Sequence, residues 1–203
     1  MSSVESAVRE SARNRIKDLV EKFNWSTKSH YTERDTITIF ILPLLESLGW
    51  NIRDVDEVKQ GGFPYHVRKS TPVDCRSPKH PDCVVLSNGT PHIVLEFKSL
   101  AYGAVDKYCQ IVVNLLDKTS YVGANYGVLT NFAQTVLYEG AEIVYCDDTS
   151  IVYSGTKLYD ASTKKYDCSS IEPLIRFSNP NEYLSKFEEL WNYLSKEKAA
   201  KSV

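Results

Sequence analysis

Two carboxylates and a lysine, Asp82, Glu96 and Lys98, are the side chains whose types and spacing most clearly indicate chemistry. Glu96 and Lys98 are two residues apart, so on a β-strand they point to the same face of the sheet. If Asp82 lies directly across from Glu96, the Cβ atoms of the two acids are roughly 4.5–5.5 Å apart. Carboxylates this close repel each other, and one keeps its proton unless a cation lies between them. Since Mg²⁺ prefers oxygen ligands, the pattern predicts a magnesium site, which should also accept Mn²⁺.

A β-hairpin is the element that must position these residues. Asn88-Gly89 is the strongest short signal for a hairpin turn, and the apolar runs 83–86 and 93–95 flank it. If the loop has three residues, 88–90, Ser87 pairs with Pro91 and Asp82 lies directly across from Glu96, and this is the register that we expect. Side chains alternate along a strand, so the same register puts both acids on one face of the sheet.

The alternative to a functional site is a solvent-exposed strand face or a structural ion pair, since Glu-x-Lys triplets are common. Glu96 and Lys98, however, interrupt the otherwise core-like run 93–98. Charges at the end of a buried strand usually have a partner or a task. The run therefore favours a functional site over a structural ion pair.

Pro81-Asp82 followed by Glu96-Phe97-Lys98 resembles the PD-(D/E)xK motif of the restriction-endonuclease-like nuclease superfamily. Segments 32–50 and 126–140 extend the similarity to the N-terminal nuclease domain of type I restriction-enzyme motor subunits. The resemblance covers about half of the chain. No G-x-x-x-x-G-K-[ST] nucleotide-binding motif follows, so the chain resembles a stand-alone nuclease without the motor.

The resemblance implies a Mg²⁺-dependent deoxyribonuclease that hydrolyses DNA phosphodiester bonds. Asp82, Glu96 and the backbone carbonyl of Phe97 would hold one or two metal ions, which lower the pKa of a bound water. Lys98 would orient that water and offset the charge that grows on the phosphate.

The resemblance also implies catalytic roles for Glu33 and Gln110. Glu33 matches an acidic residue that the family places near the metal, although a carboxylate in the first turn of a helix is also explained by the helix dipole. Gln110 matches the glutamine of the family's Gln-x-x-x-Tyr motif, but Asn114 stands where the family has tyrosine. The alternative for Gln110 is an exposed polar residue.

A basic segment precedes Asp82 and predicts contacts with DNA phosphates. Between residues 59 and 80 its only acid is Asp74, and its glycines and prolines indicate a loop. Basic loops beside a catalytic carboxylate can supply affinity for nucleic acid. A merely solvated loop is the equal alternative. The candidate DNA-binding residues are Lys59, Arg68, Lys69, Arg76 and Lys79.

The order of elements predicts an α/β fold: a restriction-endonuclease-like core with a central mixed β-sheet flanked by helices. We expect a single domain, 1–203, with its core at about 32–146. An N-terminal helix at 3–24 and a C-terminal helix at 180–196 are expected as additions.

Within the core, Thr32 is expected to cap a helix that Pro43 kinks or divides and Gly49 ends. A helix at about 104–117 should connect the hairpin to a strand at 126–130. A strand, helix and strand of this length form a right-handed crossover, which makes the two strands parallel. Further strands are expected at 135–138 and 142–145, with a hairpin at 151–158.

The five cysteines, at 75, 83, 109, 146 and 168, lack the spacing of a structural zinc site. Cys83 is expected to be a small core residue on the strand face opposite to Asp82. Disulfides are expected only if the source is a hyperthermophile. Thirteen tyrosines and one methionine lean that way, and would suit a small nuclease from a virus of hyperthermophilic archaea.

Composition limits the partners. The formal net charge is −2, so no global basic signature indicates nucleic acid. The longest apolar run, 39–45, is too short to span a bilayer, and we expect no membrane partner. The polar N-terminus lacks the apolar core of a signal peptide, so a cytoplasmic protein is expected, in the host cytoplasm if the source is a virus.

Two other functions stay open beside the DNase. A branched-DNA resolvase of the Holliday-junction type would use the same fold but needs a homodimer to place two sites at two strands. A non-catalytic DNA-binding protein would have kept the fold without the chemistry. Asp82, Glu96 and Lys98 are all present, which argues against the non-catalytic alternative.

Overall fold

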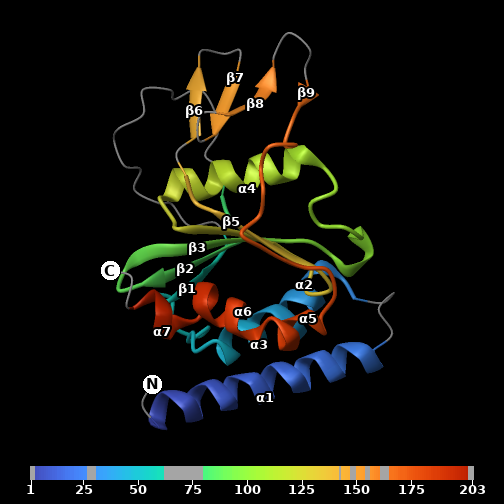
Figure 1. Cartoon of the computed structure of the whole chain (residues 1–203), viewed down its shortest axis with the longest axis vertical. Coiled ribbons are helices and arrows are strands. Elements are labelled where there is room, and N and C mark those ends of the chain that lie inside the picture. Colours follow the sequence, from blue (N-terminus) through green and yellow to red (C-terminus); the bar gives the residue numbers. More distant parts are fainter. Residues whose placement is uncertain are drawn as a thin grey trace.

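The computed structural model describes residues 3–26, 31–61, 80–141, 143–146, 150–153, 156–160 and 165–200. Its centre is a six-stranded mixed sheet of strand order β1-β2-β3-β4-β5-β10 (Figure 1). The sheet confirms the predicted α/β class with helices on both faces. Its strands are β1 (Val58–Gln60), β2 (Cys83–Ser87), β3 (Thr90–Phe97), β4 (Tyr126–Thr130), β5 (Thr135–Glu139) and β10 (Ile175–Phe177).

Helices form layers on both sides of this sheet. Helix α4 covers one face, and the short helices α3, α5, α6 and α7 cover the other, with α1 outermost (Figure 1). None of the helices in the described ranges is long and apolar enough to cross a membrane. The helices are α1 (Ser3–Trp25), α2 (Glu33–Thr36), a π-helical segment (Ile37–Ile41), α3 (Leu42–Ser47), a 3-10 turn (Leu100–Tyr102), α4 (Cys109–Val122), α5 (Glu182–Ser185), α6 (Phe187–Leu194) and α7 (Lys196–Ala199).

A second, four-stranded antiparallel sheet lies beyond α4 (Figure 1). It agrees with the expected strand near 142–145 and the hairpin at 151–158. Its strands are β6 (Ile143–Cys146), β7 (Ser150–Tyr153), β8 (Thr156–Asp160) and β9 (Lys165–Tyr166).

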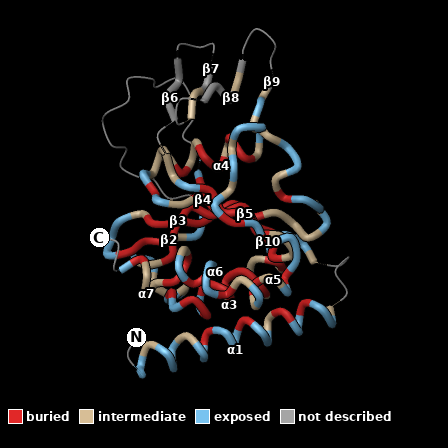
Figure 2. The backbone as a smooth tube through the Cα atoms, in the orientation of Figure 1, coloured by how far each residue is buried: buried red, intermediate tan, exposed pale blue. Residues whose placement is uncertain are grey.

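Buried residues lie in the central sheet and in the helices on both sides of it (Figure 2). The alternation of side chains along β2 and β3 divides this core into two clusters. Cys83 and Leu95 belong to the cluster on the side of α1, α3 and α6, as expected for Cys83. Val84 and Val94 belong to the cluster under α4. Asp82 and Glu96 are each two residues from one of these valines, so both acids face α4.

The turn of the β2–β3 hairpin is shorter than expected. Ser87 pairs with Thr90, which leaves a two-residue loop in which Asn88 (φ 50°) and Gly89 (φ 77°) both have positive φ. Such a turn matches the twist of the flanking strands. The predicted three-residue loop is therefore wrong.

A β-bulge restores the register that the short turn would have shifted. Leu86 pairs with Pro91 but Val85 pairs with Ile93, so His92 is the extra residue. His92 is buried, which lowers its pKa, and its Nδ1 lies 3.0 Å from Asn125 Nδ2. Beyond the bulge the strands run in the register that was expected, and Asp82 lies across from Glu96.

The crossover from β3 through α4 to β4 makes these strands parallel, as predicted. Helix α4, however, begins five residues later than expected, at Cys109. The preceding segment is held as a loop, because Val105 N–H donates to Gln134 and Asp106 pairs with Arg176. The helix continues past the expected end to Gly123, whose φ of 71° closes it.

A disulfide ties the start of α4 to the segment that follows β9. It joins Cys109 to Cys168, whose Cα atoms are 5.6 Å apart. The spacing of the cysteines had not predicted which of them would pair. Cys83 is a free, buried cysteine.

The helix expected between Thr32 and Gly49 forms as α2, the π-helical segment and α3. Thr32 caps α2 with a capping box through Asp35, as predicted. The interruption at Pro43 takes the form of the π-helical segment, in which Leu42 N–H donates to Ile37 O.

The single C-terminal helix expected at 180–196 is wrong, because three short helices replace it. The backbone of Ser195 is extended rather than helical. This conformation lets Leu194 O accept a hydrogen bond from the Trp50 indole N–H, and lets Lys196 N–H donate to Leu48 O. Strand β10 likewise places sheet residues outside the core predicted at 32–146.

Gly127 lets α4 approach β4 closely. A Cβ at this position would lie 2.7 Å from Thr119 Oγ1 and 3.1 Å from Leu115 Cγ. We expect Gly127→Ala to lower the free energy of unfolding by about 1–3 kcal/mol, because it overpacks this contact. Thr119→Ala removes the nearest atom, so the loss should be smaller in that background. Urea denaturation of the four proteins measures the coupling, and equal losses in both backgrounds would contradict the contact.

Candidate active site

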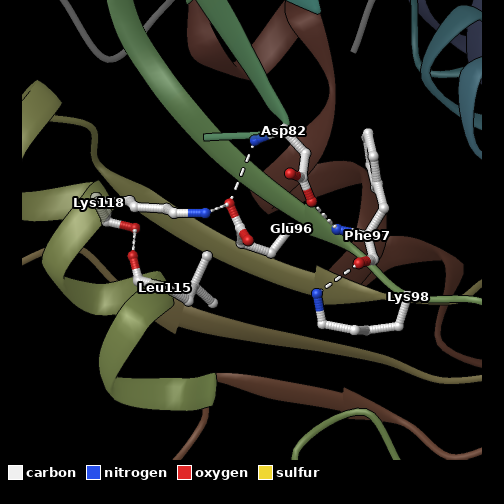
Figure 3. Close-up of polar contacts among 7 residues, drawn as sticks. Asp82, Glu96, Phe97, Lys98, Leu115 and Lys118 are labelled. Carbon is white, nitrogen blue, oxygen red and sulfur yellow. Dashed lines mark hydrogen bonds and ion pairs between the residues drawn. The ribbon is translucent and has the colours of Figure 1, made fainter. Parts of the chain in front are cut away.

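Asp82 and Glu96 lie together at the end of the β2–β3 pairing (Figure 3). The backbone N–H of Asp82 donates to Glu96 Oε1 at 3.2 Å. The backbone N–H of Phe97 donates to Asp82 Oδ2 at 2.8 Å. Each carboxylate is thus fixed by the backbone of the opposite strand, and the juxtaposition expected from the sequence is present.

Each acid uses one oxygen to hold its position. Asp82 Oδ1 and Glu96 Oε2 accept no hydrogen bond from the residues that the structure describes. Carboxylates accept several hydrogen bonds when ionised. The two remaining oxygens are therefore available to a cation or to water.

Lys98 directs its ammonium back along the strand. Its Nζ donates to the backbone carbonyl of Phe97 at 2.7 Å. The resemblance assigned this carbonyl to the metal, and Lys98 to the attacking water. Phe97 links the ammonium to the acids, because its N–H donates to Asp82 while its carbonyl accepts from the half-buried Lys98 (Figure 3).

Lys118 is the site residue that the sequence reasoning missed. It reaches from α4 to the sheet, and its Nζ lies 2.5 Å from Glu96 Oε1 (Figure 3). The two side chains are only 13% and 9% exposed, so the ion pair is largely buried. A signal was present, because Gln110, Asn114 and Lys118 are spaced by four residues and share a helix face.

Burial is the largest influence on Glu96, and it raises the pKa of this carboxyl above its usual value. The nearby charge of Asp82 raises that pKa further. The ammonium of Lys118 acts in the opposite direction but does not cancel the other two effects. Ionising both carboxyl groups is therefore costly, and a nearby positive charge stabilises the ionised form of the pair.

Glu33 and Gln110 are not joined to this site. Both are exposed, and within the described ranges no hydrogen bond or ion pair connects either residue to Asp82, Glu96 or Lys98. The capping of α2 is performed by Thr32 and Asp35. Gln110 lies in the first turn of α4, two helical turns before Lys118.

Of the candidate DNA-binding residues, only Lys59 falls within the described part of the chain. It lies in β1 and pairs with Val84, whose side chain packs under α4. Directly opposite residues share a face of the sheet, so Lys59 projects toward the side that carries Asp82. Arg68, Lys69, Arg76 and Lys79 lie outside the described residues.

The donor set fits a hard divalent cation. Two carboxylate oxygens and the nearby carbonyl of Phe97 are the ligand types that Mg²⁺ and Mn²⁺ prefer. Within the described residues no group of three His, Cys, Asp or Glu side chains forms a metal cluster. A site at Asp82 and Glu96 would therefore rely on water or substrate for its other ligands.

A separate pocket of about 510 Å³ lies between α1 and α3. Residues such as Ala7, Arg15 and Glu46 line it, together with Trp191 of α6. None of the acids or lysines described above contributes to its wall.

No protein-family model matches this chain, and neither the curated proteins nor the solved structures compared with it gave a match. The nuclease interpretation therefore depends on the motif residues and on their geometry.

Lys118 should contribute strongly to stability. Lys118→Met leaves Glu96 without its buried partner, and we expect the free energy of unfolding to fall by about 3–5 kcal/mol at neutral pH. Guanidinium denaturation measures the loss.

Lys17→Met is the matched control for this substitution. It breaks an exposed ion pair with Glu21, at 3.8 Å, and should cost less than about 0.5 kcal/mol. Similar losses in the two variants would show that the Lys118–Glu96 pair is not buried in solution.

Proposed function

We propose that this protein is a Mg²⁺-dependent deoxyribonuclease that hydrolyses DNA phosphodiester bonds at Asp82, Glu96 and Lys98. The observation that carries the proposal is the arrangement of the two acids. They lie side by side, each is fixed through one oxygen, and each keeps the other oxygen available. An ion pair that served stability alone would not require two adjacent carboxylates, because their repulsion is costly.

The chain's own residues would prepare the reaction in three ways. Asp82 and Glu96, with the carbonyl of Phe97, would hold the metal, and backbone N–H groups keep both carboxylates in place. The metal, when bound, would polarise the scissile phosphate and lower the pKa of a bound water. Lys98, whose ammonium lies at the carbonyl of Phe97, would orient the attacking water and offset the charge that grows on the phosphate.

The position of Lys59 supports DNA as the substrate. It projects from β1 toward the face that carries the acids. An ammonium there could contact a phosphate beside the scissile bond and supply affinity that does not depend on sequence. The same role is proposed for Arg68, Lys69, Arg76 and Lys79.

The direct test is incubation of the pure protein with Mg²⁺ and a panel of DNA substrates. The panel contains linear, supercoiled, single-stranded and four-way-junction DNA. Cleavage that chelation by EDTA abolishes supports the proposal. Cleavage of the junction alone, by a dimer, would indicate the resolvase instead. DNA binding without any cleavage would indicate the non-catalytic protein.

Lys98 separates chemistry from binding. We expect Lys98→Ala to cut the cleavage rate by about a hundredfold or more, the order seen when an electrostatic stabiliser is lost. Binding of metal and DNA should largely survive, because both carboxylates are untouched. Lys98→Arg should rescue the rate only in part, because a planar fork does not replace a compact charge. Single-turnover cleavage and filter binding measure the two effects.

Lys17→Ala is the control for this series, because Lys17 is an exposed residue of α1. It should cleave at the wild-type rate. If Lys98→Ala does so as well, the activity belongs to a contaminant or the catalytic lysine is misassigned.

A further inference from the structure

The four charges of Asp82, Glu96, Lys98 and Lys118 cancel when both acids are ionised. The two carboxylates then contribute two negative charges, and the two lysines contribute two positive charges. A divalent cation that approaches this cluster therefore meets two attractive carboxylates and two repulsive ammonium groups.

The two lysines do not act alike. Lys98 donates to the neutral carbonyl of Phe97, whereas Lys118 forms an ion pair with Glu96, a charged member of the proposed ligand set. Lys118 also comes from α4, which Gly127 allows to lie close against the sheet. Of these two ammonium groups, Lys118 is the one that directly offsets the charge of a metal-binding carboxylate.

We infer that Lys118 is a positioning residue that keeps metal binding weak in the free protein and makes it depend on bound DNA. This inference rests on the proposed nuclease function. A DNA phosphate brings negative charge to the cluster and so replaces the attraction that Lys118 removes. Metal and DNA then bind cooperatively, and by linkage each strengthens the binding of the other by the same factor.

The hydrogen-bond geometry allows this coupling without breaking the site. Lys118 engages Glu96 through Oε1, the same oxygen that accepts the N–H of Asp82. The oxygen Oε2 keeps its capacity for a cation. Lys118 can therefore stay in place while a metal binds, and act on it through charge. The Lys118 ammonium and a cation at Oε2 would be held by the same carboxylate. Two charges that close interact strongly where water is largely excluded.

A purely structural role for Lys118 predicts something different. In that case its removal loosens Glu96 and weakens metal binding, or leaves the affinity unchanged. An electrostatic role predicts tighter metal binding by the free protein. The direction of the change in affinity separates the two.

The test is Mn²⁺ binding followed by electron paramagnetic resonance at pH 8. Lys118→Gln removes the charge but keeps an N–H donor for Glu96, which limits the loss of stability. We expect Lys118→Gln to bind Mn²⁺ about tenfold or more tightly than the wild type does. Lys118→Arg keeps the charge and should stay within about twofold of the wild type. Circular dichroism checks that the variants are folded.

A second arm adds a short duplex whose phosphorothioate linkages slow cleavage. The duplex should raise the Mn²⁺ affinity of the wild type by about tenfold or more, within the range of allosteric coupling. The duplex should raise the Mn²⁺ affinity of Lys118→Gln by a clearly smaller factor. Equal or weaker Mn²⁺ binding by free Lys118→Gln would overturn the role of Lys118, while Mg²⁺-dependent cleavage by the wild type would leave the nuclease proposal standing. Absence of both metal binding and cleavage in the wild type would overturn the nuclease proposal itself.

Discussion

The antiparallel pairing of β2 with β3 is the constraint on which the rest of the site depends. Asp82 and Glu96 face each other only because the strands hold one register, and a slip of one residue would turn Asp82 to the opposite face. The short Asn88-Gly89 turn alone would have produced such a slip. His92 prevents it as the extra residue of the bulge, buried and in contact with Asn125. The register of the acids is therefore fixed by a residue at the far end of the hairpin.

Much of this arrangement could be predicted from local sequence. Alternation along 93–98 and the Asn-Gly turn located the hairpin and the face of Glu96, because strand periodicity and turn chemistry are local properties. The parallel strand β4 followed from the handedness of the crossover. The loop length was wrong, yet the register at the acids was right, since the bulge compensated for a turn that is one residue shorter.

Lys118 was missed because its role depends on tertiary structure. Its place on the Gln110 face is visible in the sequence, but its contact with Glu96 needs the close approach of α4 to β4. The start of α4 was misplaced for a similar reason, since the Asp106–Arg176 pair and the bond to Gln134 hold residues that could otherwise be helical. The break at Ser195 likewise depends on Trp50, which is distant in sequence. Contacts of this kind override local propensity.

A buried acid beside a half-buried one, with two lysines, is costly to assemble, because desolvation opposes every charge in the group. A protein that needed only stability could place apolar side chains there. The arrangement is explained if the acids bind a ligand, and if the lysines offset the repulsion between the two carboxylates until that ligand binds. The most direct measurement is a crystal structure grown with Mn²⁺, with diffraction data collected at the manganese absorption edge. We predict an anomalous peak in contact with the carboxylates of Asp82 and Glu96. At saturating Mn²⁺, an absence of any peak there, with the Lys118–Glu96 pair intact, would contradict it.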